Sequence, residues 1–147
     1  MKQCFLVIAA LAAVWPILTS AEQSRNFGDY TIHYSAFTTD QLTPEVAKQY
    51  QIPRSKNRVM VNISVLKKSG KNLLGKPVRA KVTGEAKNLS EQLRELQLRE
   101  VIEENAIYYI VETQVNNEET LRYTFQITPE GETAPYQLSF QEQFYTN

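Results

Sequence analysis

Residues 43–66, TPEVAKQYQIPRSKNRVMVNISVL, contain a helix start, a helix stop, a basic segment and an apolar alternation in immediate succession. Thr43 stands where a helix N-cap belongs, and Pro44 occupies the first helical position, where its missing N–H costs nothing. Pro53 ends the helix, because a proline drives the residue before it out of the α region. The last eight residues are apolar at every second position. The stretch therefore predicts one short helix near residues 43–51, followed by a half-buried strand.

The same period of two recurs on both sides of this stretch, in runs rich in β-branched and aromatic residues that are separated by Pro, Gly and Asn. Residues 88–93 leave two interpretations open, since a capping-box spacing favours a helix, whereas the leucines that follow also fit one face of a strand. We choose a turn at 88–92 and then a strand, because a tight reversal then completes a hairpin. About seven strands with almost no other helix predict an all-β antiparallel sandwich. The expected strands are residues 27–37, 59–66, 77–86, 93–102, 106–115, 120–128 and 136–144.

The N-terminal segment has the three parts of a secretory signal peptide. Lys2 supplies a positive charge, an apolar run begins at Cys4, and small residues end at Ala21. A membrane anchor is the alternative, but the run is shorter than the ~20 apolar residues of a spanning helix. We therefore expect residues 1–21 to be cleaved and residues 22–147 to form one exported domain with no stable membrane anchor. The polar start of that domain is expected to be frayed.

Composition excludes several classes of chemistry. Cys4 is the single cysteine and lies in the expected signal, so the mature chain offers no disulfide, thiol nucleophile or cysteine metal site. His33 is the single histidine, so a two-histidine metal site is not possible. Of the 16 basic residues only Lys2 is removed with the signal, and 16 acidic residues remain. A net charge near −1 does not attract nucleic acid or an anionic membrane. No metal, other cofactor or nucleic-acid partner is expected.

The one dense polar cluster is the basic segment Arg54, Lys56 and Arg58. It has two interpretations, a charged edge that prevents aggregation of strands or a recognition surface whose guanidinium groups bind an anion or a carboxylate. Between a stopped helix and a strand, these side chains are expected to reach outward. The consecutive tyrosines at 108–109 point to opposite faces of their strand, so one of them is expected to be exposed. The candidate binding residues are Tyr50, Arg54, Lys56, Arg58 and Tyr109.

One set of residues carries a family resemblance: Tyr34, LTPEVA at 42–47, IPRSKNR at 52–58, the tyrosine pair, and the closing Phe140, Phe144 and Tyr145. Together they resemble the bacterial family named domain of unknown function 4426, over nearly the whole mature chain. The resemblance implies a small exported protein of Gram-negative bacteria with an immunoglobulin-like sandwich. It implies no activity, because the family has none assigned, and no catalytic residue is carried over. A glycine commonly stands in the family pattern where this chain has Gln51, which puts the helix-stop geometry in question.

Few residues are arranged for catalysis. His33 falls on the strand face opposite Ile32, and the adjacent carboxylate pairs lie at expected turns, where they do not face each other across a cleft. Two function classes remain. The first is a non-enzymatic periplasmic module that binds a protein or an envelope component through a sheet edge or the basic segment. The alternative is a small periplasmic hydrolase or lyase that uses His33 with a carboxylate. We favour the module, since catalysis needs several cooperating polar groups, and we assign no catalytic residue.

Overall fold

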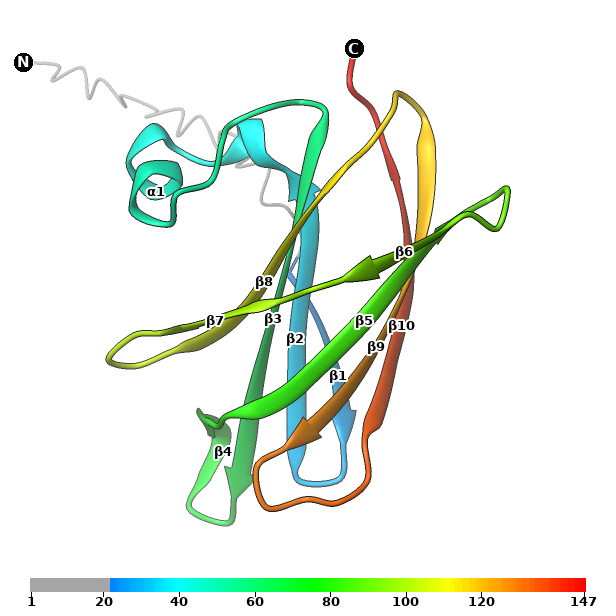
Figure 1. Cartoon of the computed structure of the whole chain (residues 1–147). Helices are drawn as coiled ribbons and strands as arrows, with labels where there is room; N and C mark the ends of the chain where they lie inside the picture. Colours follow the sequence, from blue (N-terminus) through cyan, green and yellow to red (C-terminus); the bar gives the residue numbers. More distant parts are fainter. Residues whose placement is uncertain (1–21) are drawn as a thin grey trace, which may run out of the picture.

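The computed structural model describes residues 22–147, which form two antiparallel sheets packed face to face with one short helix at one end (Figure 1). The expected signal peptide, residues 1–21, lies outside the described residues. Within residues 22–147 there is no helix with the length and hydropathy needed to cross a membrane. The predicted fold class, an all-β sandwich of immunoglobulin-like type with one helix near residues 43–51, is confirmed.

The first sheet has six strands. They are β1 (Gln23–Phe27), β2 (Tyr30–Thr38), β3 (Arg58–Ser69), β4 (Asn72–Pro77), β7 (Arg99–Ile102) and β8 (Ile107–Gln114). Their main path runs β1-β2-β3-β8-β7, and β4 forms a hairpin with the distal end of β3. β3 is thus the central strand of this path.

The second sheet has four strands. They are β5 (Ala80–Asn88), β6 (Leu93–Leu96), β9 (Glu119–Pro129) and β10 (Tyr136–Phe144), in the order β10-β9-β5-β6. Aromatic contacts place β10 against the β1/β2 side of the first sheet. The rings of Tyr34 and Phe140 stack with centroids 4.6 Å apart, and those of Phe27 and Tyr136 lie 5.2 Å apart. An edge of each sheet therefore lies on this side of the sandwich.

The core consists of the inward-facing residues of both sheets. Ile32, Val61 and Ile63 from the first sheet, with Tyr123 and Phe125 from the second, are completely buried. Full burial of one such aliphatic or aromatic side chain contributes about 1.5–3 kcal/mol. Alternate residues of β2, β3 and β9 supply most of this core, which is why the period of two was informative.

The predicted helix is α1 (Pro44–Gln49), which follows a 3-10 turn, η1 (Thr39–Gln41). The Thr43 hydroxyl accepts a hydrogen bond from the Val46 amide at 3.3 Å, so the expected N-cap is present. The buried Thr39 hydroxyl donates to the Pro53 carbonyl at 2.7 Å. That bond fixes the chain that follows the helix.

A second, smaller apolar cluster lies on the outer face of the first sheet. Ile52, just after the helix, is buried together with Met60 of β3 and Ile110 of β8. The helix segment therefore covers part of a sheet face that would otherwise be open to solvent (Figure 1).

The structure contains ten strands over the described residues, compared with about seven expected. β1 forms from polar residues that were expected to be frayed, and β4 lies in a stretch for which no strand was predicted. The stretch 93–102 divides into β6 and β7, which belong to different sheets. The turn at 88–92 is confirmed, because the Asn88 side chain accepts hydrogen bonds from the Ser90 and Gln92 amides at 3.0 Å each.

Candidate functional site

The basic segment does not form one surface. The Arg54 guanidinium donates to the carbonyl of Leu42 at 2.7 Å and to that of Asp40 at 2.9 Å, whereas Lys56 is exposed at the turn before β3. Arg54 is exposed, as expected, but its guanidinium group is hydrogen-bonded to carbonyl oxygens of its own chain. The loop before α1 presents carbonyl oxygens to it, and a guanidinium group binds such a pair with its fork of donors.

Arg58 lies apart from them, beside a residue that the sequence did not single out. Arg58 and Arg94 both line a pocket of about 680 Å³ at one end of the sandwich. Arg94 already donates to the Gln114 carbonyl at 2.6 Å and pairs with Glu119 at 2.6 Å. Arg58 faces the Glu112 carboxylate at 3.7 Å. Each guanidinium of this pocket thus has a protein acceptor beside it.

The two candidate tyrosines have structural contacts. The Tyr50 hydroxyl donates to the Glu103 carboxylate, and this bond raises the pKa of Tyr50 to about 12. The choice of Tyr109 as an exposed contact is wrong, because its side chain is 4% exposed. Burial raises the pKa of Tyr109 to about 12, and its hydroxyl accepts from the Ala80 amide at 2.7 Å and donates to Glu100 at 2.8 Å. Tyr109 thus links the two sheets.

His33 lies on the outer face of β2, as predicted. Its Nδ1 atom is 3.1 Å from the Glu22 carboxylate, in a hollow of about 280 Å³ that also contains Ser35 and Ser64. The two side chains of the pair are 31% and 67% exposed. Within the described residues, neither serine of the hollow is hydrogen-bonded to the imidazole. The arrangement is a surface contact that forms an ion pair only when the imidazole is protonated, and such pairs contribute about 0–1 kcal/mol to stability.

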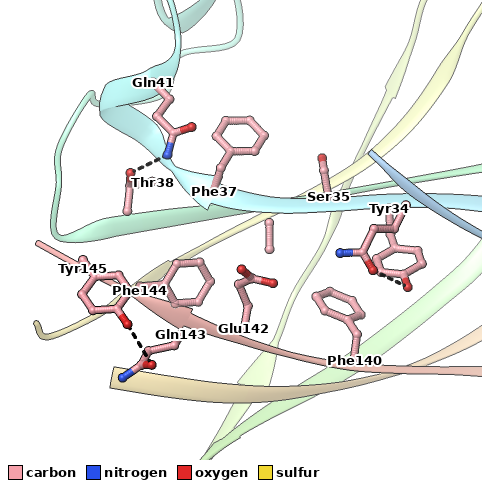
Figure 2. Close-up of a pocket in the computed structure, with 12 residues that line it drawn as sticks. Tyr34, Ser35, Phe37, Thr38, Gln41, Phe140, Glu142, Gln143, Phe144 and Tyr145 are labelled. Atoms are coloured by element: carbon pink, nitrogen blue, oxygen red, sulfur yellow. Dashed lines mark hydrogen bonds between the residues drawn. The ribbon is translucent and has the colours of Figure 1, made fainter. Parts of the chain in front are cut away.

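A different site lies where the edges of the two sheets meet. A groove of about 370 Å³ opens between β2 and β10, and Figure 2 shows its lining side chains. We call it the β2/β10 groove and define it by Tyr34, Ala36, Thr38, Phe140, Glu142 and Phe144. Of these, Tyr34, Phe140 and Phe144 are aromatic, and the amide side chains of Gln23, Gln41 and Gln143 also line the groove.

Glu142 is the unusual member of this groove. It lies in β10 between Phe140 and Phe144, on the strand face that points inward, and Figure 2 shows its carboxylate directed toward β2. Among the described residues it has no hydrogen-bond or ion-pair partner. Burial raises the pKa of Glu142 above its ordinary value. A half-buried carboxylate without a partner is destabilising, because burial removes its hydration and no donor replaces the lost water.

The sequence contained a signal for this residue. Tyr136, Leu138 and Phe140 define the apolar phase of the last strand, and Glu142 follows in that phase, before Phe144. An acidic residue in the apolar phase of a strand indicates either a buried partner or a functional carboxylate.

The groove is equipped to bind a cation. An unpaired carboxylate attracts an ammonium or guanidinium group, and aromatic faces add about 0.5–2 kcal/mol per cation–π contact. The described residues contain no cluster of three or more His, Cys, Asp or Glu that could hold a metal ion.

Residues 24–147 match the family described as domain of unknown function (DUF4426). A crystal structure of a DUF4426 family protein from Pseudomonas aeruginosa is 34% identical, over 86% of this chain and 96% of that one, with a TM-score of 0.72. The search of curated proteins found no match to this sequence.

Two more distant crystal structures share the fold. FetP of a uropathogenic Escherichia coli strain, expressed in the periplasm, is 9% identical over 86% of this chain and 95% of that one, with a TM-score of 0.60. A copper-bound variant of Campylobacter jejuni P19 is 8% identical over 84% and 94%, with a TM-score of 0.51. At these identities the likeness concerns the fold alone.

Proposed function

The chain belongs to the DUF4426 family, which has no assigned activity, and we propose that it is an exported, non-enzymatic binding module of the periplasm. Its ligand is a cationic group, the ammonium of a lysine or the guanidinium of an arginine, on a partner protein. The ligand binds in the β2/β10 groove.

Glu142 carries this proposal. A carboxylate at this inward position lowers stability, whereas glutamine would fill the same volume without a charge. Residues that lower stability are a common feature of binding sites, where the cost is offset when the ligand arrives. A cation that enters the groove restores to Glu142 the charge-assisted hydrogen bonds that burial removed.

The groove also supplies apolar contact for the stem of a long basic side chain. Phe140 and Phe144 flank Glu142 on its own strand, and Tyr34 faces Phe140 from the opposite sheet. Lysine and arginine bury their methylene stems against such surfaces while the charged head reaches a polar group. Aromatic walls with one carboxylate therefore suit a basic side chain better than a neutral or acidic one.

The alternative, a hydrolase or lyase built on His33, has one observation in its favour, the 3.1 Å contact with Glu22. Both side chains are substantially exposed, and among residues 22–147 neither serine of the same hollow is hydrogen-bonded to the imidazole. Glu142 faces the inter-sheet groove and His33 the outer face of β2, so these two groups do not serve one reaction centre.

We do not propose that this chain binds copper, although the structurally similar P19 variant is copper-bound. Copper ions prefer imidazole, thiolate and thioether ligands. Among residues 22–147 these are only His33, which pairs with Glu22, and Met60, which packs between Ile52 and Ile110. The donor set expected of a copper site is therefore missing from the described part of the chain.

The test is an NMR titration of the mature protein with Nα-acetyl-lysine methylamide. The same derivatives of norleucine and of glutamate serve as the neutral and the acidic control ligands. We expect the lysine derivative alone to shift the resonances of Tyr34, Phe140 and Phe144. Glu142→Gln should weaken binding about tenfold or more, since a hydrogen bond to a charged group contributes about 1.5–3 kcal/mol.

Glu104→Gln is the matched control, because Glu104 is exposed at the β7–β8 turn. It should bind the lysine derivative as the wild type does. Equal binding of all three derivatives, or an unaltered affinity in Glu142→Gln, would refute the proposal.

A further inference from the structure

The edge of β2 is only partly covered. β1 pairs with β2 from Phe27 opposite Tyr30 to Gln23 opposite Tyr34. β2 continues through Thr38, and β3 pairs with it along this whole length. Within the described residues, the segment Ser35–Thr38 thus has a strand partner on one side only. A further strand can pair with the main-chain groups on the side where residues 22–147 place no strand.

This open segment lacks the usual protection of an edge. Natural edge strands avoid pairing with foreign chains through charged residues, prolines or bulges. The segment 35–38 reads SAFT and contains no charge and no proline. By contrast, β1 carries Arg25, and β7, at the other edge of the same sheet, carries Arg99 and Glu100. The uncharged segment is therefore suited to pairing.

The open segment also borders the β2/β10 groove. Residues 35–38 line that groove, and Glu142 lies across it on β10, as Figure 2 shows. A strand added along this segment would continue the line of β1. Its side chains would alternate between the groove and the outer face, because successive residues of a strand point to opposite sides.

We infer that the partner enters as an extended segment, pairs with Ser35–Thr38 as an additional strand of the first sheet, and directs a lysine or arginine side chain into the groove toward Glu142. This rests on the proposed function and adds the conformation of the ligand. Main-chain hydrogen bonds to the edge contribute affinity, and the side chain in the groove contributes specificity, as in other cases of strand addition.

The charges indicate a partner protein and not a second copy of this chain. Two copies joined through the same edge would contribute SAFT segments, which offer no cation to Glu142. A foreign segment with a basic residue satisfies both the open edge and the unpaired carboxylate.

The probe is the peptide acetyl-Thr-Val-Thr-Lys-Thr-Val-Thr-amide, which as a strand directs Val and Lys to one face. Two further versions of the peptide are N-methylated at alternate amides. Alternate amides of a strand point to the same edge, so each version keeps its side chains and loses the N–H donors of one edge. Calorimetry with the mature protein gives each affinity, and hydrogen exchange reports on residues 35–38.

We expect the parent peptide to bind and to slow exchange of those amides in Ser35–Thr38 that do not pair with β3. Methylation of one edge should weaken binding at least about tenfold, and methylation of the other should leave it unchanged. Replacing the peptide lysine by norleucine should weaken binding as Glu142→Gln does.

The two proposals fail in different ways. If both methylated peptides bind like the parent while Glu142→Gln still abolishes binding, strand addition is wrong and the cation site stands. If edge methylation matters but neither Glu142→Gln nor norleucine does, the cation site is wrong and strand addition stands. Binding of acetyl-lysine methylamide without binding of the peptide overturns strand addition. So does concentration-dependent dimerisation that protects residues 35–38 in the absence of peptide.

Discussion

Gln51 adopts a backbone conformation that is unfavourable for its side chain. It has φ of +57°, and its amide donates to the Lys48 carbonyl at 3.2 Å, while the next amide, that of Ile52, donates to Ala47 at 2.8 Å. This is the Schellman arrangement of a helix C-terminus, which usually places glycine in the left-handed position. The helix thus ends in the usual way even though this chain has Gln51 where the family commonly has glycine. The cost is that a residue with a side chain occupies the left-handed conformation.

Replacing this residue should therefore stabilise the protein. Gln51→Gly removes the steric conflict of a side chain in the left-handed region, and we expect a gain of about 0.5–1 kcal/mol in the free energy of unfolding, measured in urea. Gln49→Gly, two residues earlier in the helix, is the control and should lose about 1 kcal/mol. A loss of stability in Gln51→Gly would contradict this interpretation.

Glu142 predicts a pH dependence of stability. Burial raises the pKa of its carboxyl above the ordinary 4.5, so the folded protein keeps the proton to a higher pH than the unfolded chain does. Between those two pKa values the unfolded state binds fewer protons, and stability therefore falls as the pH rises. The other titratable side chains that line the groove are Tyr34 and Tyr145.

Glu142→Gln should remove this dependence. We expect the variant to melt close to the wild type near pH 4. As the pH rises through the raised pKa, its melting temperature should increasingly exceed that of the wild type. Thermal unfolding followed by circular dichroism over this range decides the matter. A variant that is less stable at neutral pH would mean that the carboxylate has a structural partner.

At the scale of elements, the crossing from β6 to β7 carries the chain from one sheet to the other. Arg94 of β6 secures it by donating to the carbonyl of Gln114, the last residue of β8, and by pairing with Glu119 of β9. Glu119 has only 10% of its side chain exposed and also accepts from the Asn116 amide at 2.9 Å. One charged pair therefore holds three strands together.

Breaking this pair should be costly. We expect Arg94→Ala to lower the free energy of unfolding by about 3 kcal/mol, because it leaves the buried carboxylate of Glu119 without its counter-charge. Arg122→Ala removes a more exposed pair with Glu91 and should change stability by about 0–1 kcal/mol. Equal effects of the two substitutions in urea unfolding would show that burial does not distinguish the pairs.

The loop around α1 depends on Arg54 in a similar way. Because its guanidinium holds the carbonyls of Asp40 and Leu42, Arg54→Ala should lower the free energy of unfolding by about 1 kcal/mol. Lys56→Ala, at an exposed position of the same segment, should have no measurable effect. If neither substitution alters the melting curve, Arg54 is only a surface charge.

At the scale of the whole molecule, export is a testable expectation. Because the apolar segment is short and ends in small residues, the mature protein should begin at Glu22. Intact-mass measurement of periplasmic material checks this. A species in the membrane fraction that retains Met1 would contradict it. The result also bears on the open edge of β2. If the mature chain begins at Glu22, that residue alone precedes Gln23, the first residue of β1.

Much of the fold follows from local signals. Thr43, Pro44 and Pro53 define the helix through their own backbone requirements, and the period of two locates the strands of the core. The strands that were missed lack this pattern. β1 is mostly polar and is held by pairing with β2, while β6 and β7 are too short for their periodicity to reveal a change of sheet.

The sequence by itself determined the positions of the strands that have a clear period of two and the place of the helix, because each depends on neighbouring residues. Only the tertiary structure decided that Tyr109 is buried while Tyr108 is half-buried, that Arg54 turns to carbonyl oxygens, and that Glu142 faces an open groove. These outcomes depend on contacts between residues distant in the chain. A strand's pattern indicates which residues share a face, whereas the packing of the two sheets determines what that face meets.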